Sequence, residues 1–559
     1  MSKISPKFFL ALLVGLANTR VALASDFDRA IAAMETELNR SLKELRLENA
    51  VSPYFISYRL TAIEYYSVSC THGDIATEER EITQVPFVEL RVGSYDLDNT
   101  WEGFATGRYA EGGSLRFDET SLRQIFWRLS DLAYKDALRK YFDKKARLAQ
   151  ELEEEKLPDF SKEKPATQKS LSDKMPSLNT EALRQLCQGA SAEFKKYPSV
   201  DSSEVGFQFS SETRILVNTE GTRLIEESKY TPYSFGISGE ARAPDGLKVS
   251  SFRNGNVRYA SEFPAARVLA DLVKEVAEEV VNLKNAPVQM PEAAPAMLDG
   301  VSTGVFFHEA LGHRLEGSRQ REKGELQTFK GKVGQRIIPT FLTIISDPTM
   351  RAFGQQTLSG HFDFDSEGVL SQRVMLVEKG VLKNYLLSRR PIGGFLNSNG
   401  NGRAGAGNLA EGRMSVLIVD PIEGLSQAKL RERFLDEIKS RGKGFGFRMV
   451  AMRSGEAQTN RGQSQSFVAR PRLIYKVDGN GHETLIRGLE YVGTPLTAID
   501  KIVAAGDNQV LGNAYCGAAS GWVPVSHIAP SVVFSELELQ REPEERLRPP
   551  LLKPPIALQ

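Results

Sequence analysis

Residues 305–317 read VFFHEALGHRLEG, and the organisation of the chain is best followed outward from this stretch. Apolar residues lead into His308, and Ser302 or Thr303 can cap the start of a helix. Gly317 is well placed to end that helix, because glycine is favoured just beyond a helix C-terminus. The stretch therefore predicts a short helix that carries chemically active side chains.

Two histidines and a glutamate lie in this predicted helix in the order HExxxH. The step from His308 to His313 is one residue longer than in the HExxH zinc motif. Positions i and i+5 of an α-helix diverge by about 140°, so both imidazoles reach one ion only if the helix bulges or ends near Gly312. The spacing alone leaves open a metal site or a capped helix with locally bonded histidines. Two of only six histidines flank Glu309, which favours the metal.

A third ligand is needed, because catalytic zinc usually has three protein ligands and one open position. Cys516 is the best candidate, since it lies in the glycine-rich stretch GNAYCG over 512–517 and a thiolate binds zinc strongly. His527 competes with it, and a small packed cysteine is the alternative without metal. Two imidazoles and a thiolate suit zinc better than magnesium or calcium.

The chain before this motif mixes helices and strands. Periodicity and turn residues predict the following elements: a helix from Asp26, strands over 53–92, a helix from Asp118 that runs into the charged stretch 140–156, a flexible loop or insertion over 157–178, a strand meander over 202–258, and a helix from Pro264 with the stripe Val268, Leu272, Val276 and Val280.

The chain after the motif reads mainly as strands. The expected elements are one short helix at the motif, a strand over 340–346, and hairpins over 374–385 and 473–486. The fold class is therefore α+β, an N-terminal mixed domain followed by a β-rich C-terminal domain that carries the HExxxH helix. The predicted limits are a signal peptide over 1–24, an N-terminal domain over 25–286 with a charged insertion near 140–180, a C-terminal domain over 287–540, and a proline-rich tail over 541–559.

Charge and cysteine content exclude some classes of protein. The chain of 559 residues has 71 basic and 71 acidic side chains, so it lacks a general basic field for nucleic acid. Three cysteines are too few for a disulfide-built scaffold. Cys70 and Cys187 could pair and leave Cys516 free, although nothing in the sequence fixes their separation.

The first residues are typical of an export signal. A basic start precedes the apolar run 8–17, and Ala22-Leu23-Ala24 is a cleavage pattern before Ser25. We therefore expect an exported protein, periplasmic or extracellular. No later stretch reaches eighteen apolar residues, so stable membrane insertion is not expected.

Two other polar stretches imitate known sites. Asp363, Asp365, Glu367 and Gly368 resemble the start of a calcium loop, but its twelfth position is Val374 rather than glutamate, and a turn is favoured. The glycine-rich stretch 400–407 lacks the lysine of a phosphate-binding loop.

Several of these stretches together resemble the TldD/PmbA family, in particular its metal-binding TldD type. The resemblance rests on four stretches and covers about residues 200–535: HEALGHRLEG, DFDSEG with the later GVLKNYLLSR, GNGR over 400–403, and CGAASGWVPVS. It implies an α+β N-terminal domain followed by a β-rich C-terminal domain.

The resemblance also implies roles for particular residues. His308, His313 and Cys516 would bind one Zn²⁺ per chain, and Glu309 would be the catalytic base. The implied activity is hydrolysis of peptide bonds in unfolded or short peptides, by a homodimer or a mixed assembly with another family member. His527 falls where the family pattern does not call for histidine and is left outside the metal set.

The chemistry of these groups is consistent with such a hydrolase. Zinc acidifies water and polarises a carbonyl, and Glu309 would take the water proton and return it to the leaving amine. Arg403, Tyr515 and His527 remain open as oxyanion stabilisers. For Glu316, a surface carboxylate is favoured over a hydrogen-bond acceptor behind a ligand.

Two other functions remain open. Cys516 could be a nucleophile activated by His308 or His313, which leaves Glu309 without a role. The chain could instead be a non-catalytic peptide-binding or assembly subunit with a structural metal. An intact Glu309 beside both histidines speaks against that second function.

Overall fold

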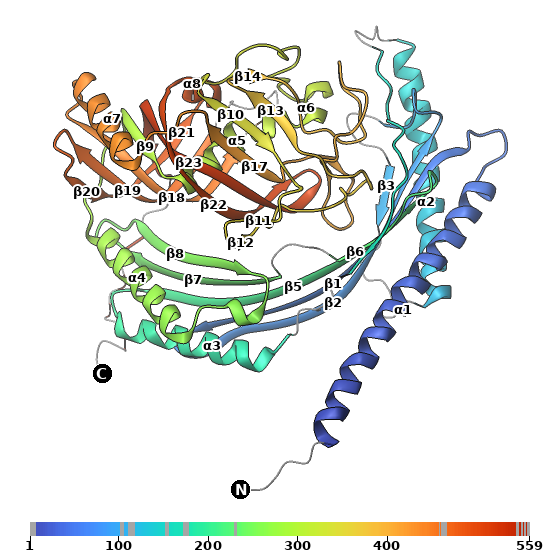
Figure 1. Cartoon of the computed structure of the whole chain (residues 1–559), viewed down its shortest axis with the longest axis horizontal. Helices are drawn as coiled ribbons and strands as arrows, with labels where there is room; N and C mark the ends of the chain where they lie inside the picture. The colour runs from blue at the N-terminus through green and yellow to red at the C-terminus, as the bar shows by residue number, and fades with distance from the viewer. Residues whose placement is uncertain are drawn as a thin grey trace.

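The computed structural model describes residues 7–100, 106–109, 118–150, 156–171, 178–227, 232–457, 459, 467–543, 547, 548, 550, 552 and 555. Figure 1 shows a long curved sheet from the N-terminal half lying beneath a β-rich C-terminal half. Within the described residues, no helix combines the length and apolarity needed to cross a membrane. The predicted signal peptide is not tested, and its first six residues lie outside the described ranges.

The N-terminal half is built on an eight-stranded sheet in the order β3-β2-β1-β5-β6-β4, which β7 and β8 extend from β5. The strands are β1 Pro53–Thr71, β2 Asp74–Val92, β3 Thr106–Tyr109, β4 Thr167–Ser170, β5 Ser202–Asn218, β6 Arg223–Glu227, β7 Tyr233–Arg242 and β8 Lys248–Val257. The predicted strands over 53–92 and 202–258 are confirmed.

Four helices cover one face of this sheet in two pairs, α1 Lys7–Glu44 with α2 Glu119–Leu148, and α3 Thr180–Ala192 with α4 Ala266–Asn285. The first pair packs on Ile56 and Tyr58 of β1, and the second pair packs on Val68 and Cys70 of the same strand. Side chains alternate between faces along a strand, so these even-numbered residues share one face. The opposite face turns toward the C-terminal half, where Arg59 donates to the carbonyl of Ser366.

The C-terminal half is built on an eleven-stranded sheet in the order β14-β13-β10-β17-β23-β21-β19-β18-β9, with β20 on β19 and β22 on β23. Its strands are β9 Glu292–Leu298, β10 Leu342–Ser346, β13 Val374–Glu378, β14 Val381–Leu382, β17 Val416–Pro421, β18 Phe445–Ala457, β19 Phe467–Asp478, β20 Glu483–Ile486, β21 Leu489–Gly493, β22 Ile502–Ala518 and β23 Gly521–Arg541. Two small ladders are separate from it, β11 Ala352–Phe353 with β12 Gln356–Thr357, and β15 Gly402–Arg403 with β16 Glu411–Gly412.

Helix α5, Gly300–Ala310, packs against this sheet and shares the largest apolar core with it. The short α6, Gly317–Arg321, follows it. The expectation of one helix was incomplete, because α7 Gln427–Ser440 and α8 Pro495–Asp500 are also present. The α+β class with a β-rich C-terminal half is confirmed, and the predicted domain limits stay predictions.

The stretch predicted as a flexible loop over 157–178 is only partly described, and the described part is packed. Phe160 is 2% exposed and meets the ring of Phe55 edge-on, with 4.9 Å between centroids. Strand β4 pairs in parallel with β6. The predicted flexibility was wrong for the described part. Polar composition and prolines report only local preference, whereas the packing of Phe160 against Phe55, far away in the sequence, holds this stretch in place. Residues 172–177 lie outside the described ranges.

Helix α4 exists as predicted, but only Val276 and Val280 of its predicted stripe are buried, and Leu269 and Val273 replace Val268 and Leu272. Val268 is 48% exposed, and the buried side chains include Leu269, Val273, Val276 and Val280. Two apolar stripes lie side by side on this helix, and the sheet covers the one whose steps of three and four follow the 3.6-residue turn.

A disulfide joins Cys70 at the end of β1 to Cys187 in α3, with 5.7 Å between the Cα atoms. Cys516 is the free cysteine among the described residues and is buried. The bond fastens α3 to the sheet across a loop of 117 residues. Crosslinks across long loops restrict the unfolded chain strongly.

Replacing both Cys70 and Cys187 with serine is therefore expected to lower the free energy of unfolding by about 2–4 kcal/mol. Urea unfolding of the mature protein measures this change. A reducing agent should shift the wild-type midpoint by a similar amount and leave the double variant unmoved. Equal midpoints for the oxidised wild type and the variant would contradict the crosslink.

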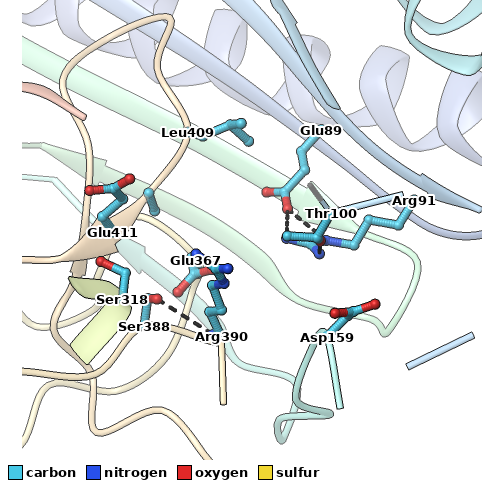
Figure 2. A pocket seen from close by; sticks show the side chains of 11 residues that line it. Glu89, Arg91, Thr100, Asp159, Ser318, Glu367, Ser388, Arg390, Leu409 and Glu411 are labelled. Atoms are coloured by element: carbon cyan, nitrogen blue, oxygen red, sulfur yellow. Dashed lines mark hydrogen bonds and ion pairs between the residues drawn. The ribbon is translucent and has the colours of Figure 1, made fainter. Parts of the chain in front are cut away.

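A seam of charged side chains joins the two halves (Figure 2). Arg91 pairs with Glu89 at 2.7 Å, and Arg321 of the C-terminal half pairs with Asp159 at 2.9 Å. The cavity that Glu89, Arg91 and Asp159 line with Arg390 of the C-terminal half is about 20 Å³, which is enough for one water molecule. The seam therefore holds the halves together and has no room for a substrate.

The stretch that imitates a calcium loop forms a turn, as predicted. Buried Asp365 accepts hydrogen bonds at 2.9 Å from the backbone N–H groups of Glu367, Val369 and Gly402. Burial raises the pKa of Asp365 to about 6. Its carboxyl group organises backbone, which explains an acidic residue at this position without a bound cation.

Candidate metal centre

The HExxxH stretch lies at the point where its helix ends. Helix α5 stops at Ala310, and a turn of 3₁₀ helix follows over Gly312–Leu315. A Cβ atom at Gly312 would lie 1.9 Å from the sulfur of Met414, so only glycine fits there. Of the two geometries expected near Gly312, a bulge or an end of the helix, the structure has the end, which allows the two histidines to face one point. The expected helix end at Gly317 was wrong, because Gly317 begins α6.

The cap of this helix differs from the prediction. Asp299, rather than Ser302 or Thr303, is the capping residue, and its carboxylate accepts a hydrogen bond of 2.8 Å from the Ser302 N–H. The hydroxyl of Thr303 instead donates to the carbonyl of Asp299. A carboxylate at this end also interacts favourably with the helix dipole.

The structure brings together the three side chains predicted as ligands. The Cys516 Sγ lies 3.0 Å from His308 Nε2 and 3.5 Å from His313 Nε2. One donor atom from each residue lies within 4.8 Å of the other two, and all three residues are buried. Cys516 comes from β22, opposite Val523 of β23 in the register. The sheet thus places a residue more than 200 positions away against the helix end.

The donor set fits zinc in kind and in spacing. Zn–S bonds of about 2.3 Å and Zn–N bonds of about 2.0 Å at a tetrahedral angle separate nitrogen from sulfur by about 3.5 Å. The His313 distance matches this value, and the His308 distance is shorter by half an ångström. Two imidazoles and one thiolate also leave a fourth position open, as a catalytic site requires.

The surroundings favour a thiolate at Cys516 and a neutral imidazole at His308. Burial alone would raise the pKa of Cys516, but His313 and the guanidinium of Arg413 outweigh it and lower that pKa. Arg413 Nη2 donates to Sγ at 3.0 Å. Burial lowers the pKa of His308 to about 4, so its ring is neutral at pH 7.

Glu316 is not the surface carboxylate that was favoured from the sequence. Its side chain is fully buried, and its Oε1 lies 2.8 Å from His313 Nδ1. Arg319 Nε donates to Oε2 at 2.6 Å. Burial opposes charge on His313, yet Glu316 and Cys516 outweigh it and raise the His313 pKa to about 10. A carboxylate behind a ligand histidine fixes the orientation of that ring.

Glu309 lines the cavity beside this cluster. Its Oε2 lies 3.8 Å from His313 Nε2, and a Cβ atom at Gly455 would lie 2.6 Å from its Cγ. The cavity has a volume of about 390 Å³, within the usual range for small-ligand sites. Its other walls include the end of β18 and the β22–β23 hairpin, where Tyr515 and Trp522 are exposed.

Of the three candidates for oxyanion stabiliser, Tyr515 lines the cavity. Arg403 donates instead to the carbonyls of Met414 and Pro524, at 2.5 and 2.7 Å. His527 lies behind the cluster, with its Nε2 2.8 Å from His308 Nδ1. A phenol has a pKa of about 10, so Tyr515 keeps its proton at neutral pH and can donate it in a hydrogen bond.

Arg413 was missed from the sequence. It lies in a stretch without any recognisable motif, and only the pairing of β22 with β23 brings the backbone of Cys516 within its reach. Arginine is almost never fully buried unless it is paired, and Arg413 is fully buried beside Glu316. This burial marks Arg413 as part of the site, and it cannot be read from the sequence.

Comparison with known proteins places this geometry in a class. Residues 291–541 match the family model described as the PmbA/TldA metallopeptidase C-terminal domain, so the C-terminal half is similar to the domains of that family. A metalloprotease of Methanocaldococcus jannaschii is 28% identical over 282 residues, which are 49% of this chain and 58% of the relative. The resemblance to the TldD/PmbA family that the sequence motifs predicted is confirmed for the C-terminal half, which matches the family model and is similar to relatives named TldD homologs.

Two further proteins are similar to this chain. A zinc metalloprotease TldD homolog of Saccharolobus solfataricus is 25% identical over 348 residues, 61% of this chain and 72% of the relative. TldE from Thermococcus kodakarensis has a similar fold, with a TM-score of 0.59 at 13% identity over 91% of this chain and all of that one. The chain spans little more than half of the length of the relative from Methanocaldococcus jannaschii.

Proposed function

We propose that this chain is an exported zinc-dependent peptidase that hydrolyses peptide bonds in short or unfolded peptides. The observation that carries the proposal is the buried cluster of His308, His313 and Cys516 beside Glu309, at the wall of one cavity. The names of its relatives as metalloproteases support the same chemistry.

His308, His313 and Cys516 would hold one zinc ion per chain. Zinc would supply a Lewis acid that polarises a peptide carbonyl and acidifies water. The Glu309 carboxylate would accept the proton of the attacking water and deliver it to the leaving amine. The Tyr515 phenol would donate a hydrogen bond to the developing oxyanion, because it keeps its proton and lines the cavity.

The substrate would be an extended peptide. Along Gly455–Ala457 strand β18 pairs with β19, whereas its pairing with β9 is confined to Phe447–Met449. Gly455, Glu456 and Ala457 line the cavity, so a peptide could add to this edge through its backbone. Side-chain preference should then be weak, and a steep preference in a random peptide library would count against this binding mode.

Export and assembly are part of the same proposal. The signal-like start supports a periplasmic or extracellular location, and the Cys70–Cys187 bond fits an oxidising compartment. From the family resemblance we expect a homodimer or a mixed assembly with another family member.

Removal of the metal is the test of this proposal. We expect 1,10-phenanthroline to abolish hydrolysis of an unstructured fluorogenic peptide by the mature protein, and one equivalent of zinc to restore it. A cysteine hydrolase would resist the chelator and be inactivated by iodoacetamide; the 3.0 Å contact between Cys516 and His308 makes this arm necessary. A peptide-binding subunit would bind the peptide with zinc present and cleave nothing.

A further inference from the structure

His527 belongs to no motif, yet its side chain is directed at the proposed metal centre. Its Nε2 lies 2.8 Å from Nδ1 of His308, and both rings are buried. The other nitrogen of His308, Nε2, lies 3.0 Å from Cys516 Sγ. The His308 ring therefore lies between the ligand cluster on one side and His527 on the other.

The contacts at the two ring nitrogens of His308 determine which nitrogen carries the proton. A histidine nitrogen binds a metal only through its lone pair, so Nε2 must be free of a proton when the site is loaded. The proton of the neutral ring then lies on Nδ1, where a buried N–H requires an acceptor. The lone pair of His527 Nε2 is the acceptor at hydrogen-bond distance.

We propose that His527 is a positioning residue that holds His308 in the tautomer and orientation in which Nε2 faces the metal. This inference rests on the proposed metal site. His527 thereby replaces the carboxylate or backbone carbonyl that usually supports a ligand histidine. Glu316 supports His313 in the usual way, with a carboxylate. The two ligand histidines thus have one charged and one neutral acceptor.

The backbone around His527 fixes its place. His527 lies on β23 opposite Gly512 of β22 and Leu417 of β17, so hydrogen-bonded strands flank it on both sides. Gly304 precedes His308 by four residues and shares its face of α5. A Cβ atom at Gly304 would lie 2.7 Å from Cβ of His527, so the glycine leaves the space in which this imidazole packs.

His527 is not itself in the ligand set. The three donor atoms that lie within 4.8 Å of one another belong to His308, His313 and Cys516. His527 Nε2 contacts the Nδ1 of His308, whereas the sulfur of Cys516 lies beside the Nε2 of that ring. The position of His527 therefore fits a role that acts through His308 and does not fit direct binding of the metal.

The test is zinc affinity of the full mature chain, measured by competition with a chromogenic chelator. We expect His527→Leu to weaken zinc binding by about 10–100-fold, the usual loss when a ligand histidine loses its acceptor. His527→Gln should bind nearly as tightly as wild type, because its Oε1 can accept the same hydrogen bond. Gly304→Ala should resemble His527→Leu, since it displaces the imidazole without removing it.

The control is His361→Leu, which removes another imidazole that is also 6% exposed but whose Nδ1–H donates to the carbonyl of Pro348. It should leave zinc affinity unchanged. A purely structural role would lower the melting temperature of the metal-free His527 variants and leave their affinity equal to wild type, which would overturn the inference. Equal weakening by the glutamine and leucine variants would overturn it as well.

The failure of the inference is distinct from that of the proposed function. If the wild type binds zinc and His527→Leu binds it equally well, the role of His527 is wrong and the peptidase proposal stands. If the folded wild type binds no zinc, both fall. If His527→Leu does not fold, the comparison of Gly304→Ala with His527→Gln still decides the outcome.

Discussion

Glu309→Gln is expected to lower peptide hydrolysis by about 10²–10⁴-fold, the usual contribution of a general base, while zinc stays bound. Glutamine keeps the shape of the side chain beside Gly455, where space is tight, but it cannot accept the proton of water. Steady-state hydrolysis of a fluorogenic peptide and zinc content of the same preparation measure the two effects separately.

The matched control for this variant is Glu456→Gln. Glu456 also lines the cavity but comes from β18, and the proposed binding mode uses its backbone, so its carboxylate has no part in the proposed catalysis. It should retain most of the activity. Wild-type turnover in Glu309→Gln would refute its role as base, and loss of zinc from that variant would make Glu309 a ligand instead.

The second large effect is expected from Cys516→Ser, which should weaken zinc binding by more than about 100-fold. That loss exceeds the 10–100-fold cost of removing a group behind a ligand, because the thiolate contacts the metal itself. Serine still offers an oxygen to Arg413, so the buried guanidinium keeps an acceptor and the fold should persist. Zinc content after dialysis and circular dichroism check the two parts.

The double variant Cys70→Ser and Cys187→Ser is the control for Cys516→Ser. It removes two cysteines on the opposite half of the molecule and should keep its zinc. If Cys516→Ser retained zinc, this cysteine would be a packed core residue, and His527 would be the next ligand to examine.

Local patterns predicted what depends on local geometry. The end of α5 near Gly312 followed from the mismatch between an i, i+5 spacing and the helical turn, and the structure has that end. The hairpins at 374–385 and 473–486 followed from their turn glycines, and both are present. These features depend on residues within one or two turns of each other.

Contacts across the chain could not be predicted in this way. The buried Glu316 carboxylate faces Arg413 from a distant part of the chain, and Phe160 is anchored by Phe55 of β1. Cys516 was expected near His308 because a zinc site needs a third ligand and because the chain resembles a family in which a late cysteine is a ligand, and no local pattern links the two positions. Neither periodicity nor composition records which distant side chains meet. The ligand roles themselves stay predictions until zinc is measured.

Strands β1 and β5 have a consequence for how the N-terminal sheet keeps its alignment. They pair without a shift from Ser57 opposite Asn218 to Cys70 opposite Val205, and both helix pairs rest on this one ladder. A slip of one residue would turn every apolar side chain of a strand to the wrong face. The error would expose apolar surface at both ends of the sheet at once. Each helix pair therefore also helps to fix the strand register in the half of the sheet that it does not touch.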